Sequence, residues 1–438
     1  MTVSLSAWWL PLLAIPVLLL GEYLHRKIKA LGRYNIPVPV VGGLTLCIAL
    51  LVLDGLGLVS LGFQTKVSAG WWTWLVTPEP EWTGRPEKGV NLPFLIGFFT
   101  CIGLNATWSV VRKGSWQVPL FLGLASLLAV FQNALGVGLA KLMGESPLLG
   151  LICGSITQTG GHGTALGFAE TLERAGFQSA ATVGAAAATF GLICGSIIGG
   201  PIGGRLIRKY NLSPAKDGPI AEAKAEKAES ALVEVAKHEP GIFSGIRAFA
   251  GQGRKAVGHM LLLALLIKIG AWASWGLQQA GFVFPAYMGA LLAGLVIRNV
   301  LEGLGKTWID SHVVDLMGGL LLGIFLSMAM MSLNLKELAS SAVPMLVILA
   351  VQVAMVALFT TFVTFRLMGS DYDAAVMASG HCGFAHGATP SAIANMDSVT
   401  HKFGPAHRAF IVVPMVGGMF IDVTNSLNIT WFINYLKI

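Results

Sequence analysis

The chain has 438 residues, of which 54% are hydrophobic and 12% charged, and its mean hydropathy is +0.71. Soluble domains carry roughly 25% charged residues, so this composition excludes an ordinary soluble protein and predicts a helical protein that crosses a membrane many times. The net charge of +7 does not indicate a nucleic-acid partner, because the cations lie in loops between apolar runs and there set the orientation in the lipid bilayer.

Ten apolar runs have the length of membrane-spanning helices, about 20 residues each. Two further apolar stretches, 147–171 and 374–396, each contain a run rich in glycine and histidine. Each stretch is either one complete span or a re-entrant hairpin that enters and leaves on the same side. The ten predicted spans are 5–25, 37–59, 90–109, 117–141, 178–204, 257–279, 283–301, 313–333, 341–366 and 406–434.

The distribution of lysine and arginine favours the hairpin alternative. With ten crossings, 21 of these cations fall on one side of the membrane and seven on the other. Cytoplasmic loops carry the excess of positive charge, so the segment 205–255 is predicted to be cytoplasmic and both termini are predicted to lie outside. Hairpin 147–171 then enters from outside and hairpin 374–396 from inside.

Three landmarks recur in the two halves of the chain at offsets of 226, 225 and 224 residues. Five crossings per copy is an odd number, so the second copy must be inverted relative to the first, as in many secondary transporters. We therefore predict a first five-span repeat over 1–204, a cytoplasmic linker over 205–255 and a second repeat over 256–438. The matched landmarks are Gly97–Gly103 with Gly323–Ala329, Val118–Leu120 with Val343–Met345, and His162-Gly163 with His386-Gly387.

The two glycine-rich runs interrupt the hydrophobic sequence at corresponding places. They read Thr-Gly-Gly-His-Gly-Thr over 159–164 and Gly-His-Cys-Gly-Phe-Ala-His-Gly-Ala-Thr-Pro over 380–390. Helix-breaking residues at membrane depth are tolerated only where the backbone is buried in protein or lines a watery site. A matched pair of such interruptions points to the binding site of a transporter.

These two runs, together with Gly103-Leu104-Asn105-Ala106 and Phe420–Asn425, resemble the bacterial sodium/glutamate symporter family. The resemblance covers nearly the whole chain, although the second run departs from the Gly-Gly-x-Gly signature at His381. It implies two inverted five-span repeats, hairpins that meet near the midplane, and a homodimer in the bacterial inner membrane. It also implies cotransport of glutamate with Na+, by movement of a hairpin domain against a fixed dimerisation domain.

Glutamate carries two carboxylates, which need backbone N–H groups and hydroxyls as donors. Half-helix N-termini and glycine-rich turns present such donors. Asn105 follows a glycine of its own and is predicted either to touch the ligand or to join helices. The residues predicted to bind substrate are Asn105, Thr157, Thr159, Gly160, Gly161, His162, Gly163, Thr164, Gly387 and Ala388.

Sodium needs oxygen ligands, which unwound carbonyls and polar side chains of the second repeat can supply. Asp422 is the only acid well inside the final span, and an intramembrane carboxylate is a functional candidate by default. The predicted sodium ligands are Thr389, Asp422, Thr424 and Asn425.

Several alternatives stay open at this point. His162 is a metal ligand, a proton carrier or a hydrogen-bonded hairpin residue, and Arg408 is an alternative partner for the distal carboxylate. A Na+- or H+-coupled carrier of another dicarboxylate, or a channel, shares the same broken hairpins. An enzyme is disfavoured because the chain has no His-Glu-x-x-His helix, serine nucleophile elbow or phosphate loop.

Overall fold

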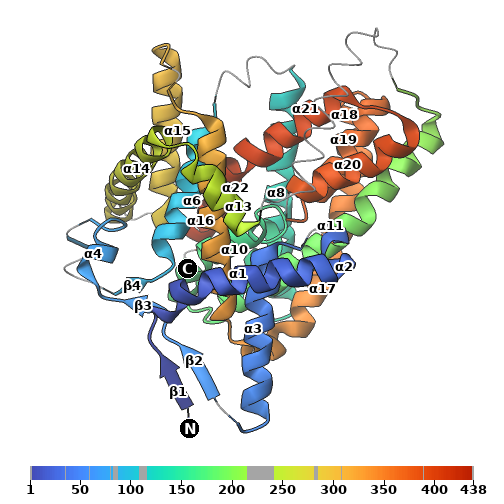
Figure 1. Cartoon of the computed structure of the whole chain (residues 1–438). Helices are drawn as coiled ribbons and strands as arrows, with labels where there is room; N and C mark the ends of the chain where they lie inside the picture. Colours follow the sequence, from blue (N-terminus) through green and yellow to red (C-terminus); the bar gives the residue numbers. More distant parts are fainter. Residues whose placement is uncertain are drawn as a thin grey trace.

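A computed structural model of the chain consists largely of packed helices (Figure 1). It describes residues 2–34, 36–58, 60–78, 80–81, 87–107, 116–214, 241–280, 285–306, 308–387 and 389–436. Most of the predicted linker, 215–240, is outside these ranges, and its described part contains the short helix α13, Ile242–Ala250.

The first half of the chain forms long helices joined by short strands and turns. Four short strands occur among its connecting segments, which the helical prediction did not include: β1 pairs in parallel with β2, and β3 pairs antiparallel with β4. The elements are β1 (Thr2–Leu5), α1 (Trp9–Lys27), α2 (Lys29–Arg33), α3 (Val38–Gly55), β2 (Ser60–Phe63), β3 (Lys66–Val67), α4 (Gly70–Thr73), β4 (Lys88–Gly89), α6 (Leu92–Asn105), α8 (Gln117–Leu142), α9 (Pro147–Leu151), η1 (Ile152–Ile156), α10 (Gly161–Arg174) and α11 (Ala180–Tyr210).

In the second half, π-helical segments, written η as in η1, interrupt two of the long helices. Such single-turn π segments are frequent at functional sites. The elements after α13 are α14 (Arg254–Gln279), α15 (Ala286–Gly303), α16 (Ser311–Met331), α17 (Leu335–Phe359), η2 (Thr360–Thr364), α18 (Phe365–Leu367), α19 (Tyr372–Phe384), α20 (Thr389–Phe403), α21 (His407–Met415), η3 (Val416–Phe420) and α22 (Ile421–Tyr435).

Within the described residues, six helices are long and apolar enough to cross a membrane, or seven if the bent pair α21–α22 is one span. These helices are α3, α8, α11, α14, α16 and the continuous stretch Ser341–Leu367. The remaining predicted spans also contain helices, but α6 has only 14 residues. The prediction of a helical membrane protein is confirmed, whereas the number of ten crossings stays a prediction.

The long helices pack as two groups. The first group consists of α1, α3, α6, α13, α14, α15 and α16, which contact one another far more than they contact the other helices. The second, here called the tip group, consists of α8, α9, α10, α11, α17, α18, α19, α20, α21 and α22 with the three π segments. In Figure 1, α14 and α15 lie on one side of the molecule, and α11, α19 and α20 lie on the opposite side.

Candidate functional site

The first glycine-rich run forms a tip between a broken helix, α9–η1, and α10. Ser146 caps α9 by accepting a hydrogen bond of 3.3 Å from the Leu148 amide. Inside η1, Gly154 leaves the helical conformation, with φ −87° and ψ −140°. The chain turns over residues 157–160, and α10 begins at Gly161, whose φ of +62° is in the left-handed region that favours glycine.

The second run forms a tip between α19 and α20. Asp371 caps α19 by accepting a hydrogen bond of 2.9 Å from the Ala374 amide. After α19 ends at Phe384, Gly387 turns the chain with a φ of +120°, and α20 begins at Thr389. Ala388, predicted to bind substrate, lies outside the described residues.

The two tips touch at Gly161 and Gly387. A Cβ atom at Gly161 would overlap the carbonyl oxygen of Gly387, and a Cβ at Gly387 would lie 3.4 Å from the carbonyl oxygen of Thr157. At Gly161, space and the left-handed backbone conformation both require glycine, whereas at Gly387 only the backbone conformation, with φ +120°, requires it. As a result, α10 and α20 begin close to each other, and a helix N-terminus presents unpaired N–H groups and a partial positive charge.

Gln132 of α8 connects the two tips through hydrogen bonds. Its Oε1 accepts from the Thr159 hydroxyl at 2.6 Å, and its Nε2 donates to the Ala385 carbonyl at 2.9 Å. Gln352 of α17 donates to the Gln132 carbonyl at 2.7 Å. Both glutamines are fully buried, and hydrogen bonds strengthen in such a low-dielectric environment. This network holds the two tips in a defined relation to α8.

Ser155 in η1 is held from two sides. Asn133 Oδ1 accepts from the Ser155 amide at 2.8 Å, and Asn425 Nδ2 donates to the Ser155 carbonyl at 3.0 Å. The remaining atoms of this cluster, Ser155 Oγ, Asn133 Nδ2 and Asn425 Oδ1, are buried without a hydrogen-bond partner. Since buried polar atoms nearly always have partners, these three atoms retain unused hydrogen-bonding capacity beside the first tip, of the kind that a bound water molecule satisfies.

Some predicted substrate residues form the first tip itself. Thr157 donates to the Ile152 carbonyl at 2.7 Å, and Thr159 bonds to Gln132 as described. Thr164 packs over Gly160, where a Cβ atom would overlap it. Thr157, Thr159 and Gly160 thus form the turn that leads into α10, and the Thr157 and Thr159 hydroxyls already donate to η1 and α8.

Other predicted substrate residues face away from the contact between the tips. His162 Nε2 lies 2.9 Å from Thr189 Oγ1 of α11, which matches the interpretation of a hydrogen-bonded hairpin residue. Gly163 faces Phe98 of α6, 3.4 Å from an added Cβ. Asn105 donates to Asp315 at 2.5 Å in the first helix group, so the structure does not bring it into hydrogen-bond contact with the tips.

Of the four predicted sodium ligands, one begins α20 at the second tip and three lie in the first turns of α22. Thr389 donates to the Gly417 carbonyl at 2.6 Å, and Thr424 accepts from Ser126 at 2.9 Å. Asn425 reaches Ser155, which places one of the four beside the first tip as well. Asp422 is partly buried in the first turn of α22, and within the described part of the chain it has no ion pair.

The family model for "Sodium/glutamate symporter" matches residues 3–71 and 85–405, which include both tips. The chain belongs to the sodium/glutamate symporter family. It is 40% identical over 417 residues to the sodium/glutamate symporter of Escherichia coli strain K12, covering 95% of this chain and 94% of that protein. The Haemophilus influenzae sodium/glutamate symporter is 36% identical over 427 residues, covering 97% of this chain and 96% of the relative. The resemblance inferred from the motifs is confirmed.

In this symporter-family chain, the two histidines of the second hairpin form hydrogen bonds with the protein itself. His381 Nδ1 lies 2.8 Å from Thr364 Oγ1 of η2, and His386 Nδ1 lies 2.7 Å from the Cys382 carbonyl. Both rings are fully buried. Among the described residues, no three His, Cys, Asp or Glu side chains are grouped closely enough to hold a metal ion.

Arg408, the alternative partner for a distal carboxylate, lies at the base of the second hairpin. Its guanidinium contacts Asp371 at 2.5 Å and Asp373 at 3.3 Å. Asp373 also accepts from the backbone amides of Arg408 and Ala409, at 3.0 and 3.2 Å. Arg408 therefore fastens α19 to α21 in this conformation, and its charge is directed away from the tips.

Sequence reasoning missed the connecting role of Gln132, Asn133 and Gln352. From sequence alone, the Gln132-Asn133 pair is predicted either to join helices or to touch the ligand, and no local pattern singles out Gln352. The signal that finds them is an amide side chain in the middle of an apolar run, because such a group needs hydrogen-bond partners within the bilayer.

Proposed function

We propose that the protein imports glutamate together with Na+ across the bacterial inner membrane. The observation that carries the proposal is the contact between two glycine tips at the starts of α10 and α20, in a chain of the sodium/glutamate symporter family. Two half-helix N-termini that converge within a membrane protein form a site for an anionic substrate.

The start of α10 is the better of the two anion sites. Its first turn, Gly161-His162-Gly163, contains no proline, whereas the first turn of α20 contains Pro390, which has no N–H to donate. Thr157 and Thr159 lie in the turn that directly precedes it. We therefore assign one glutamate carboxylate to the α10 tip, with Gly387 and Ala388 contributing backbone from the opposite tip.

Sodium is proposed to bind next to this site with oxygens of Thr389, Asp422, Thr424 and Asn425. Asp422 supports this assignment, because a carboxylate at membrane depth without a cationic side-chain partner is expensive unless a cation or a proton neutralises it. The orphaned Asn425 Oδ1 and Ser155 Oγ add two uncharged oxygens of the kind that Na+ accepts.

Matched helix contacts support two inverted repeats and ten crossings. Gly21 of α1 meets the backbone of α3, and Gly270 meets the backbone of α15 in the same way from α14. In the proposed repeats, α3 and α15 are counterparts, as are α6 and α16. The contact of α3 with α16 therefore corresponds to that of α15 with α6, and the contact of α8 with α22 corresponds to that of α17 with α11. Pairing of this kind is expected when two copies of one five-span unit are related by a pseudo-twofold axis. The charge distribution orients them with both termini outside.

The division into two helix groups supports an elevator-type movement. Both tips and the proposed ion ligands belong to the tip group, whereas α6, α15 and α16 of the first group contact α10 through side chains. We propose that the tip group carries the substrate past the first group. A homodimer formed through the first group stays a prediction. Light scattering of the purified protein measures the molar mass and so tests it.

Uptake into proteoliposomes tests the proposal. Radiolabelled glutamate should accumulate above equilibrium with an inward Na+ gradient and should not do so when choline replaces Na+. Accumulation driven by a pH gradient alone would instead indicate an H+-coupled carrier, and equilibration without any gradient would indicate a channel. Competition by a series of dicarboxylates and amino acids then defines the substrate.

A further inference from the structure

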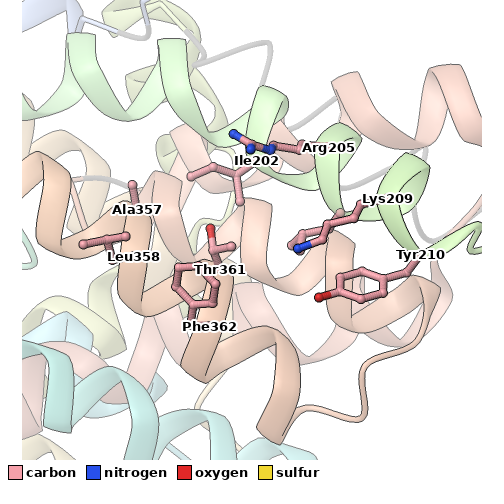
Figure 2. Close-up of a pocket in the computed structure, with 9 residues that line it drawn as sticks. Ile202, Arg205, Lys209, Tyr210, Ala357, Leu358, Thr361 and Phe362 are labelled. Atoms are coloured by element: carbon pink, nitrogen blue, oxygen red, sulfur yellow. The ribbon is translucent and has the colours of Figure 1, made fainter.

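A cavity of about 290 Å³ lies away from the tips, between the end of α11 and the end of α17 with η2. Its lining combines two cations and a phenol from α11 with an apolar wall from the facing helix. The lining residues are Ile202, Arg205, Leu206, Lys209, Tyr210, Ala357, Leu358, Thr361 and Phe362 (Figure 2).

The cavity lies where two membrane spans end side by side. The apolar part of α11 ends just before Arg205, and the stretch Ser341–Leu367 ends next to Arg366. Tyr210 stacks on Phe365 with ring centroids 5.3 Å apart, which holds the two ends at the same level. Basic and aromatic side chains at such ends mark the depth of lipid headgroups.

The charge of the cavity has one sign. No carboxylate lines it, and within the described part of the chain neither Arg205 nor Lys209 has an ion pair. In Figure 2, the Lys209 ammonium and the Tyr210 hydroxyl point toward the helix that carries Thr361 and Phe362. On that facing helix, Leu358 and Phe362 are 58% and 50% exposed, so an apolar strip adjoins the cationic end.

We propose that this cavity binds an anionic phospholipid. The phosphate would lie between Arg205, Lys209 and the Tyr210 hydroxyl, and an acyl chain would run along Leu358 and Phe362. A free anion would bind only the cationic end of the cavity, whereas a lipid would bind the cationic end through its headgroup and the apolar wall through its acyl chain. Basic pockets between membrane helices are typical binding sites for anionic headgroups. Since α11 packs on α10, α19 and α20, the bound lipid would contact the helix that supports both tips.

Native mass spectrometry of the full-length protein tests the proposal, with phosphatidylglycerol, phosphatidylcholine and inorganic phosphate as probes. Wild type should retain phosphatidylglycerol in preference to phosphatidylcholine. The double variant Arg205→Gln/Lys209→Gln should weaken that retention by about 30-fold, because it removes the attraction of two cations for the headgroup. The double variant Arg247→Gln/Arg254→Gln is the matched control, since it removes the same charge from exposed positions outside the cavity.

A second variant distinguishes lipid binding inside the cavity from nonspecific attraction of the lipid by surface charge. Ala357→Phe fills the cavity without changing its charge, and it should also lose phosphatidylglycerol. Equal retention by wild type and Arg205→Gln/Lys209→Gln would overturn the proposal, and so would equal losses in the control double variant. Displacement of the lipid by millimolar inorganic phosphate would assign the cations to a free anion and would likewise overturn it. None of these readouts depends on which substrate is transported.

Discussion

Replacing Gly161 by alanine tests whether contact between the tips builds the substrate site. The new Cβ would overlap the Gly387 carbonyl, so the tips must separate by about 1 Å to reach ordinary contact distance. The φ of +62° adds about 1–2 kcal/mol of strain. A shift of this size breaks a backbone hydrogen bond to a carboxylate, which is worth about 1.5–3 kcal/mol. The apparent affinity for glutamate should therefore fall about 10- to 100-fold.

Two other glycines separate the causes of this effect. Gly176 also has a positive φ, +103°, but no atom lies within 4 Å of an added Cβ, so Gly176→Ala introduces backbone strain alone. Gly138 lies in α8 with equally open space and ordinary helical geometry, so Gly138→Ala should leave uptake nearly unchanged and raise stability by about 0.5–1 kcal/mol. Concentration-dependent uptake and thermal unfolding measure all three variants. If Gly161→Ala keeps the wild-type apparent affinity, or loses no more than Gly176→Ala, the tip contact does not form the site.

Three further substitutions test separate parts of the molecule. Asp422→Asn should raise the Na+ concentration for half-maximal uptake about tenfold, and an unchanged Na+ dependence would remove this residue from the ion site. Thr159→Val should lower stability by about 1–3 kcal/mol, because Gln132 Oε1 stays buried without its donor; an unchanged Tm contradicts this. The hydrogen bond from Lys255 lowers the pKa of the Asp310 carboxyl in the folded protein. This hydrogen bond therefore stabilises the fold at pH values above the ordinary carboxyl pKa, and its contribution is lost as the pH falls through the lowered pKa. The free energy of unfolding of Lys255→Gln should therefore fall less than that of wild type between neutral pH and about pH 3. If the unfolding free energies of the two proteins change in parallel with pH, the coupling is refuted.

The broad fold and the family could be predicted from sequence because both depend on local signals. Apolar runs of about 20 residues identify helices at membrane depth, and the run over 159–164 identifies the family. The prediction that both glycine-rich runs form turns agrees with the positive φ at Gly161 and Gly387. A turn of this type is encoded by a few adjacent residues.

The contacts between the tips and their surroundings could not be predicted in the same way. Gln132 reaches Thr159 and Ala385, which are 27 and 253 residues away in the chain. Asn105 looked equally suitable as a site residue, yet it and its partner Asp315, 210 residues away, both lie in the first helix group and not in the tip group. No local pattern distinguishes an amide that faces a tip from one that faces a neighbouring helix, since both are single polar residues in apolar runs.

The glycines of α11 explain why the second hairpin and this helix should move together. Gly191, Gly195, Gly199 and Gly203 recur every four residues, and an added Cβ at each would press against His386, Asn395 or Ser379 of the hairpin. Such a stripe lets helix backbones approach closely and interlock, which opposes sliding. Between the two helix groups, by contrast, Gly163 and Gly167 of α10 meet the side chains of α6, α15 and α16 rather than backbone. Side chains can change rotamers where backbone cannot, so this boundary is the one along which the tip group is expected to slide.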